Sequence, residues 1–209
     1  MSDQLLDQLR SSSVRFFGVA SGSFVSPDGL LMTNHHVASE CIQQLSTKKQ
    51  DYMRNGFYAA TLAGERKCPD LEADVLLAME DVTEKVKEGT VGVDSAEAAR
   101  LRRANIARIE KECAAGAGSR CEVVTLYSGG LYHLYKYKKY SDLRLVFAPE
   151  SSVAAFGGDP DNFTYPRYCL DVAFLRAYED GKPARTPNHL RWSREGVKEG
   201  ELVFVSGHP

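Results

Sequence analysis

A tight turn between two apolar runs leads directly into a pair of histidines. The turn Pro27-Asp28-Gly29 separates residues 23–26 from the run Leu30–Asn34, and proline followed by Asp-Gly is typical of a β-turn. The two runs are therefore predicted to pair as a β-hairpin. Since His35 and His36 follow the second strand directly, a rigid element would hold their imidazoles with the ring tips at the surface.

Short apolar or alternating segments, separated by turn residues, recur along the rest of the chain. We predict strands at residues 14–19, 73–82, 121–127, 131–140, 142–148, 171–178 and 202–205. The last of these is expected to be a buried strand that runs into a turn. Many short strands at this spacing are typical of a β-barrel or a β-sandwich, so the chain is predicted to be mainly β.

Residues 83–119 interrupt this pattern with a segment in which Lys and Glu become frequent. Asp94 and Glu97 have the spacing of a helix N-terminal capping box. Four residues that follow fall on one face of the predicted helix: Ala98, Leu101, Ile109 and Cys113. We therefore predict one domain over residues 1–209, with an α-helical insertion at about 83–119.

The composition argues against two classes of partner. The chain has 26 basic and 28 acidic residues and a net charge of -2, so it has no excess of positive charge for nucleic acid. The alternation of Tyr and Lys in residues 131–144 is therefore interpreted as an amphipathic strand. No apolar run approaches the roughly 18 residues of a membrane span, and we expect neither a nucleic acid nor a membrane partner.

Five cysteines are present, an odd number that leaves at least one unpaired: Cys41, Cys68, Cys113, Cys121 and Cys169. No C-x-x-C pair occurs, and neither a metal site nor a cofactor is expected. The predicted helix ends near Cys113 and the next strand begins at Cys121, so a short loop would bring these sulfurs together. A disulfide there would indicate an oxidising compartment, and we expect a periplasmic or secreted protein, although residues 1–10 lack the apolar stretch of a signal peptide.

His36 and Asp171 have the setting of a general base and its orienting acid. A histidine at the end of a strand is held in a fixed position, which proton transfer requires. Asp171 leads directly into the apolar run Val172–Leu175, where a buried carboxylate would fix the tautomer of an imidazole. Asp74 and Asp142 also adjoin apolar strands and are weaker alternatives, because no distinctive loop precedes them.

The histidine segment resembles that of chymotrypsin-like serine peptidases, in which a threonine at the end of a strand precedes the catalytic histidine by three positions. Matched residue by residue, Thr33 leads to His36 as the base, and Asp171 follows in the order His, Asp, Ser of these enzymes. Many relatives have a disulfide between the start of this hairpin and the residue after the histidine. Here those positions are Ala20 and Val37, which implies apolar packing in place of the bridge.

The loop from Phe156 to Arg167 is the most specific element, with Gly-Gly-Asp, Asp-Asn-Phe and Pro-Arg steps. It resembles a loop of the bacterial dipeptidyl-peptidase 7 and 11 family of serine exopeptidases, and the resemblance extends from Val14 to Pro209. In that family the asparagine binds the α-amino group of the substrate and the next aromatic residue closes the pocket, which implies these roles for Asn162 and Phe163. Phe163 stands where the family has tryptophan, so the indole N–H donor is missing.

The resemblance implies a chymotrypsin-like β-barrel, part of a double barrel, that releases dipeptides from peptide substrates with a free N-terminus. The nucleophile of the family lies in a Gly-x-Ser-Gly motif, which these 209 residues lack. We therefore expect the serine beyond Pro209 and expect the 209-residue chain to be inactive by itself. An apolar face left open on half of a double barrel would also favour a homodimer.

Three other interpretations fit parts of the sequence. HtrA-type endopeptidases share the Thr-Asn-x-His-Val sequence around His36, but residues 157–167 speak against that group. A catalytically inactive barrel that serves as a binding module is the second alternative. A metal site at the two histidines is the third, but only Cys41 lies close by and no H-E-x-x-H motif occurs, so His35 is expected to be structural.

Overall fold

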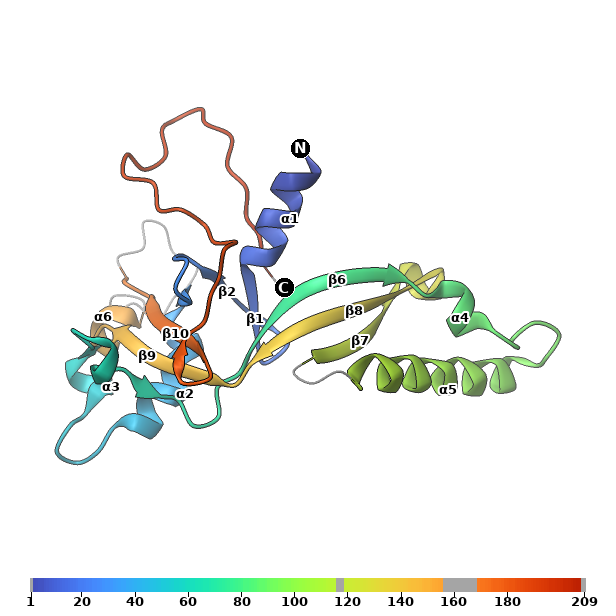
Figure 1. The fold of residues 1–209 in the computed structure, drawn as a ribbon, viewed down its shortest axis with the longest axis horizontal. Coiled ribbons are helices and arrows are strands. Elements are labelled where there is room, and N and C mark those ends of the chain that lie inside the picture. Colours follow the sequence, from blue (N-terminus) through green and yellow to red (C-terminus); the bar gives the residue numbers. More distant parts are fainter. Residues whose placement is uncertain (1, 116–118, 156–168, 208–209) are drawn as a thin grey trace. The chain divides into compact units, whose positions relative to one another are not determined.

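The computed structural model describes residues 2–115, 119–155 and 169–207, and its chain forms two compact units (Figure 1). The first unit combines Met1–Ala73 with Tyr140–Pro209, and the second is Asp74–Lys139. Because the first unit is assembled from the two ends of the sequence, its site residues can come from segments far apart in the chain. The two units are described separately below.

An antiparallel sheet forms the centre of the first unit, with strands in the order β4-β9-β10-β3-β2-β1. The strands are β1 (Ser13–Phe16), β2 (Ala20–Phe24), β3 (Leu30–Thr33), β4 (Phe57–Tyr58), β5 (Arg66–Lys67), β9 (Asp142–Ala148), β10 (Ala173–Glu179) and β11 (Lys182–Pro183). Short β5 pairs with β9, and β11 with β10. The predicted mainly β fold is confirmed, and the sheet agrees with a barrel of the chymotrypsin-like kind.

The predicted hairpin is formed by β2 and β3, and its tip rests against the main chain of β10. Gly29 has φ +71°, which favours glycine, and a Cβ atom there would lie 2.7 Å from the carbonyl oxygen of Ala177. The Gly29 carbonyl accepts a hydrogen bond from the Ala177 N–H at 2.9 Å, and its own N–H donates to Thr186 Oγ1 at 3.0 Å. Glycine at position 29 is therefore required by close packing as well as by the turn.

In the described ranges, this sheet is accompanied by four helices: α1 (Asp3–Ser12), α2 (His35–Leu45), α3 (Tyr52–Asn55) and α6 (Ser151–Ala154). Helix α2 begins two residues after the end of β3, so His35 and His36 form its first turn. A 3₁₀ turn occupies Leu62–Gly64. The largest fully buried side chains of the unit come from the strands and from α2, and they include Phe16, Phe24, Leu31, Ile42, Leu143, Leu145 and Leu175.

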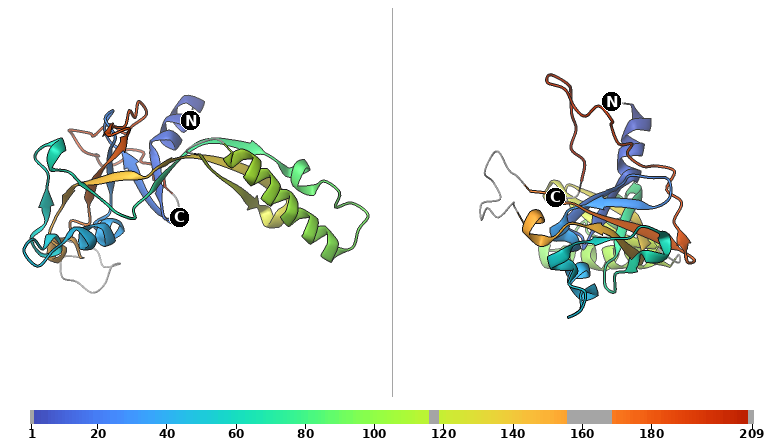
Figure 2. Two further views of the ribbon diagram at one scale, coloured as in Figure 1. Left: turned by 60° about the horizontal axis from the view of Figure 1, so that its bottom comes forward. Right: turned by 90° about the vertical axis from the view of Figure 1, so that its left-hand side faces the viewer.

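The second unit packs two helices on a three-stranded sheet with the order β6-β8-β7. Its elements are β6 (Ala73–Asp81), α4 (Thr83–Lys87), α5 (Ser95–Ala114), β7 (Ser119–Leu126), a 3₁₀ turn at Tyr127–Gly129 and β8 (Leu131–Tyr140). Helix α5 runs along β7 (Figure 2, left). The predicted helix cap is confirmed, since Asp94 accepts a hydrogen bond from the Glu97 N–H at 2.9 Å. Ile109 of α5 packs with Val82, Val86 and Tyr132. The compact unit thus includes three strands in addition to the helices predicted at 83–119.

The strand predicted at Leu202–Val205 is wrong. Residues 202–205 have no strand structure, and their side chains are largely exposed, from 55% for Phe204 to 100% for Val205. An apolar run becomes a buried strand only where it meets a sheet edge and a covering layer, and the described residues offer this run neither. Separately, no helix in the described ranges is both long and apolar enough to span a bilayer.

Candidate active site

The register between β3 and β10 explains why residues 36 and 171 meet. These strands are antiparallel, with Thr33 directly opposite Ala173. Two residues forward from Thr33 and two residues back from Ala173 lead to His35 and Asp171, so the start of α2 lies beside the entrance to β10. A separation of 135 residues in the sequence is thus closed by one pair of neighbouring strands.

His36 and Asp171 form a hydrogen-bonded pair, with 2.7 Å between the imidazole Nδ1 and the carboxylate Oδ2. The acid is buried, with 7% of its side chain exposed, whereas the histidine side chain is 64% exposed. With Nδ1 held by the carboxylate, Nε2 is the nitrogen left for proton transfer. A buried acid behind an exposed imidazole is the arrangement that general-base catalysis needs, and the catalytic roles of both residues stay a prediction.

Two further donors hold the carboxylate of Asp171. The backbone N–H of His36 donates to Oδ1 at 3.1 Å. The side-chain amide of Asn34 donates to Oδ2 at 3.2 Å and to the main-chain carbonyl of the same aspartate at 3.1 Å. These bonds offset the cost of burying a charged group, because each carboxylate oxygen has at least one donor.

His35 lies next to the pair but is buried, as expected for a structural residue, with 5% exposure. Burial is the main reason that the pKa of His35 is lowered, and it outweighs the opposing effects of the Asp171 charge and of a hydrogen bond to the backbone of Pro149. Since proline has no N–H, its carbonyl must accept from the ring. His35 thus ties the first turn of α2 to the end of β9 and stays neutral over most of the physiological range.

Cavities of different character adjoin Asp171. One of about 200 Å³ is mainly apolar and lies beside His36, with Met53 and Ala154 in its wall. The other, of about 220 Å³, is lined by hydroxyl groups that include those of Thr33 and Ser206. An apolar hollow beside an exposed imidazole is suited to a side chain of a bound peptide.

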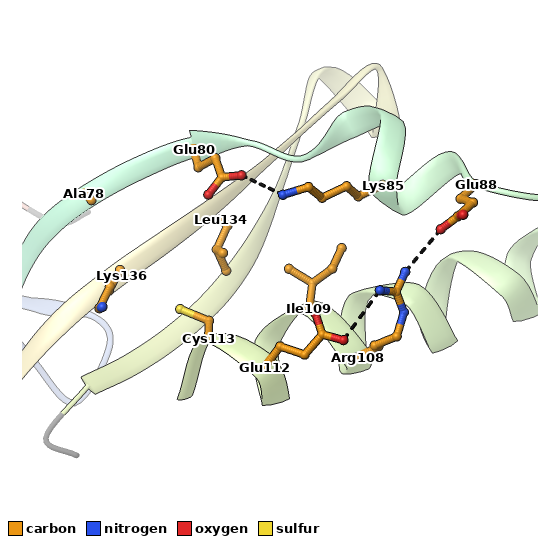
Figure 3. Close-up of a pocket in the computed structure, with 10 residues that line it drawn as sticks. All are labelled: Ala78, Glu80, Lys85, Glu88, Arg108, Ile109, Glu112, Cys113, Leu134 and Lys136. Carbon is orange, nitrogen blue, oxygen red and sulfur yellow. Dashed lines mark hydrogen bonds and ion pairs between the residues drawn. The ribbon is translucent and has the colours of Figure 1, made fainter. Parts of the chain in front are cut away.

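A larger cavity, of about 590 Å³, lies in the second unit and contains none of the predicted site residues (Figure 3). Its charged groups largely neutralise one another, since Lys85 lies 2.7 Å from Glu80, and Arg108 lies 3.3 Å from Glu88 and 3.6 Å from Glu112. No histidine is among the residues that line it. The chemistry of the His36–Asp171 pair, and not cavity size, therefore identifies the candidate site.

The remaining candidates have different outcomes. Asn162 and Phe163 lie outside the described residues. Asp74 and Asp142, the weaker candidates for the acid, form ion pairs with Arg120 and Arg144 respectively. In the part of the chain with described positions, no group of three or more His, Cys, Asp or Glu side chains could hold a metal ion.

Sequence reasoning missed Asn34 as part of the site. Asn34 occupies the position directly before α2, where asparagine normally caps the helix. Only the structure reveals that its side chain is turned toward Asp171 instead.

Disulfides fasten both units. The predicted bond between Cys113 and Cys121 is confirmed, with Cα atoms 6.0 Å apart. A second bond, which the sequence did not predict, joins Cys41 of α2 to Cys68, with Cα atoms 5.1 Å apart. Cys41 lies five residues after His36, so the helix that carries the histidine is covalently anchored at a different point from the bridge of chymotrypsin-like relatives. Cys169 is a free thiol.

Comparison with known proteins shows the family of the chain. The family model described as Peptidase S46 matches residues 1–209. The chain is 37% identical to the Asp/Glu-specific dipeptidyl-peptidase of Capnocytophaga gingivalis, over 96% of this chain and 30% of that protein. It is 34% identical to the dipeptidyl-peptidase 7 of Phocaeicola vulgatus, over 93% of this chain and 29% of that protein.

A solved structure is also similar to the fold of this chain. Porphyromonas endodontalis DPP11 in complex with substrate superimposes with a TM-score of 0.81 and 32% identity, over 92% of this chain and 31% of that one. The chain therefore spans less than a third of the length of these relatives. Together with the family model that covers all its residues, the comparisons identify it: the chain belongs to the peptidase S46 family.

Proposed function

We propose that this chain supplies the general base and the orienting acid of a serine dipeptidyl-peptidase, which releases dipeptides from the free N-terminus of peptides. The observation that carries the proposal is the 2.7 Å contact between His36 Nδ1 and Asp171 Oδ2. That contact puts a buried carboxylate behind an exposed imidazole in a family whose relatives are named dipeptidyl-peptidases.

In this mechanism Nε2 of His36 takes the proton of a serine hydroxyl as its oxygen attacks the scissile carbonyl. The imidazolium then gives that proton to the departing amine, and a water molecule deacylates the enzyme by the same route. Asp171 stays ionised and fixes the tautomer with Nε2 unprotonated. The nucleophile would come from outside these 209 residues, because they contain no Gly-x-Ser-Gly motif.

Recognition of a free N-terminus is assigned to Asn162 and Phe163. An exopeptidase that removes two residues must bind an ammonium group at a fixed distance from the scissile bond. The amide oxygen of Asn162 would accept a hydrogen bond from that ammonium, and the ring of Phe163 would close the pocket. Support comes from the resemblance of their loop to that of the dipeptidyl-peptidase 7 and 11 family.

The test is His36→Ala in a full-length protein that contains this chain, assayed with fluorogenic dipeptide substrates. We expect kcat to fall by at least about 10³-fold while the circular dichroism spectrum is unchanged. His189→Ala serves as the control, because that histidine is half-buried on a surface segment of the same unit. Equal turnover by His36→Ala and the wild type would exclude the proposed base.

Blocking the substrate separates the exopeptidase from its alternatives. N-acetylation should abolish turnover by the wild type, because the amine clamp then has no ammonium to bind. An HtrA-type endopeptidase would tolerate the acetyl group. A barrel that serves only for binding would cleave neither substrate, and we expect the 209-residue chain alone to cleave neither as well.

An oxidising location and self-association complete the proposal. The two disulfides favour a periplasmic or secreted protein, since cytosolic reductants keep thiols reduced. Mass spectrometry of the non-reduced protein from cell fractions would test this. Exposed apolar side chains at Leu202–Val205 favour a homodimer, which sedimentation of the chain would reveal.

A further inference from the structure

Asn34 stands at the N-cap of α2 but does not cap it. Its backbone is extended, with φ -77° and ψ 151°, and its side chain makes no hydrogen bond to the helix. Asparagine is among the best capping residues at this position, because its side-chain oxygen can accept from the N–H of the second or third helical residue. The diversion of the side chain therefore needs another explanation.

Asp171, which lies far from Asn34 in the sequence, caps α2 instead. The N–H of His36, the second residue of α2, donates to Asp171 Oδ1 at 3.1 Å. The positive end of the helix also favours a carboxylate at this place. The acid that orients the imidazole thus also terminates the helix from which the imidazole projects.

Asn34 in turn holds the acid. Its Nδ2 donates both to Oδ2 and to the main-chain carbonyl of Asp171, at 3.2 and 3.1 Å. Two bonds from one nitrogen to the side chain and the backbone of one residue oppose rotation of that side chain. Without Asn34, His36 would be the only remaining donor to the carboxylate among the described residues, and it is the group that the acid has to orient.

Connection between the strands does not require Asn34. The ladder between β3 and β10 already joins Thr33 to Ala173 and continues to Leu30 and Arg176. The two bonds of Asn34 therefore add orientation of the carboxylate and no new contact between strands. This distinguishes a positioning residue from a structural one.

We propose that Asn34 is a positioning residue for the His36–Asp171 pair, an inference that rests on the function proposed above. It leaves the helix cap to Asp171 and locks the carboxylate in the orientation that aims His36. The informative variant is Asn34→Ser, because serine caps a helix as well as asparagine does but is too short to reach both acceptors. Asn34→Ala lacks both abilities, and Asn188→Ala at an exposed site is the matched control.

The first readout is independent of catalysis and uses the 209-residue chain. Labelling with ¹⁵N-histidine, and assignment by comparison with His36→Ala, would locate the proton on His36 Nδ1. In the wild type and in the Asn188→Ala control, we expect the resonance of this proton at low field and its exchange with water to be slow. In Asn34→Ser and Asn34→Ala we expect it to exchange at least about tenfold faster, because a rotating carboxylate exposes it. An unchanged resonance in both variants would overturn the inference.

The second readout uses the full-length peptidase. We expect both variants to lower kcat by about 10- to 100-fold with KM nearly unchanged, because a misaligned base affects the transition state more than substrate binding. Wild-type kcat in Asn34→Ser would mean that the bonds from Asn34 to Asp171 are not needed to orient the base, which would overturn the inference. An inactive wild type whose imidazole proton still responds to Asn34→Ser would contradict the proposed function and leave the positioning of the pair supported.

Discussion

Asp171 binds His36 twice, with Oδ2 at 2.7 Å from the ring nitrogen Nδ1 and Oδ1 at 3.1 Å from the backbone N–H. One carboxylate therefore determines both the tautomer of the imidazole and the start of the helix that carries it. A displacement of the Asp171 carboxylate would therefore change the position of the His36 imidazole in two ways. It would act directly on the ring, and it would shift the first turn of α2.

Asp171→Asn in a full-length peptidase should preserve the fold and lower kcat by about 10⁴-fold, because an amide can donate to Nδ1 and so stabilise the wrong tautomer. KM should change little. Steady-state kinetics with a dipeptide substrate would check this. Asp142→Asn is the control, since that carboxylate pairs with Arg144 and should leave kcat unaffected. Substantial activity in Asp171→Asn would show that another group orients the base.

His35 should make the folded state sensitive to mild acid. Burial lowers the pKa of His35, so the unfolded chain binds the proton more tightly than the folded one. The stabilisation of the folded state by neutral His35 is therefore fully present above about pH 6.5, the ordinary pKa of histidine. It is lost as the pH falls through the pKa of His35 in the folded chain. His35→Asn retains a donor for Pro149 and does not titrate in this range.

Urea unfolding of the 209-residue chain at pH 7.5 and pH 5 would measure the effect. We expect a smaller loss of unfolding free energy between these pH values in His35→Asn than in the wild type. His189→Asn should behave like the wild type. Equal pH dependence in the wild type and His35→Asn would contradict the assignment.

Tyr178 should contribute to sensitivity at alkaline pH. Its hydroxyl donates to Glu65 Oε2 at 2.7 Å, and Arg144 stacks on its ring at 3.7 Å. Burial, together with the neighbouring Glu65, raises the pKa of Tyr178 to about 12. Since the folded pKa lies above the ordinary value, this stabilisation is complete below about pH 10 and is lost as the pH rises toward 12.

Tyr178→Phe should therefore be less stable than the wild type at pH 8, and the difference between the two proteins should narrow between pH 10 and pH 12. Urea titrations followed by circular dichroism would measure it. Tyr58→Phe, at an exposed position, is the control. A constant difference across this pH range would be inconsistent with a titrating hydroxyl.

The disulfide between Cys41 and Cys68 should contribute more stability than that between Cys113 and Cys121. For separations of 27 and 8 residues, chain entropy gives about 3.5 and about 2.5 kcal/mol respectively. Paired Cys→Ala variants at the two bonds, compared by denaturant unfolding, would test the order. If removal of the 41–68 bond lowered the free energy of unfolding less than removal of the 113–121 bond, loop-closure entropy would not be the main source of the stabilisation.

The sequence predicted those features whose determinants are local. Pro27-Asp28-Gly29 specified the turn, Asp94 with Glu97 specified the start of α5, and the short loop between Cys113 and Cys121 limited the partner of each sulfur. Asp171 could be found as well, because a carboxylate that leads into an apolar strand is unusual unless it has a partner.

Features that depend on distant neighbours could not be predicted. Cys41 and Cys68 meet through tertiary packing, and five cysteines allow many pairings. Residues 202–205 form the continuous apolar run of a buried strand, but pairing requires a sheet edge that a sequence pattern cannot supply. Asn34 has the sequence position of a helix cap. Only the structure shows that Asp171 lies close enough to accept a hydrogen bond from its side-chain amide.

The contact of the hairpin tip with β10 means that a substitution at Gly29 could shift both His36 and Asp171. Strand β3 has this tip at one end and leads to His36 at the other, while β10 is preceded by Asp171. A side chain at position 29 would wedge the two strands apart, because its first carbon would meet the Ala177 carbonyl at 2.7 Å. Random mutagenesis that selects for altered turnover should therefore recover changes at this turn, although Gly29 makes none of the hydrogen bonds described for His36 and Asp171.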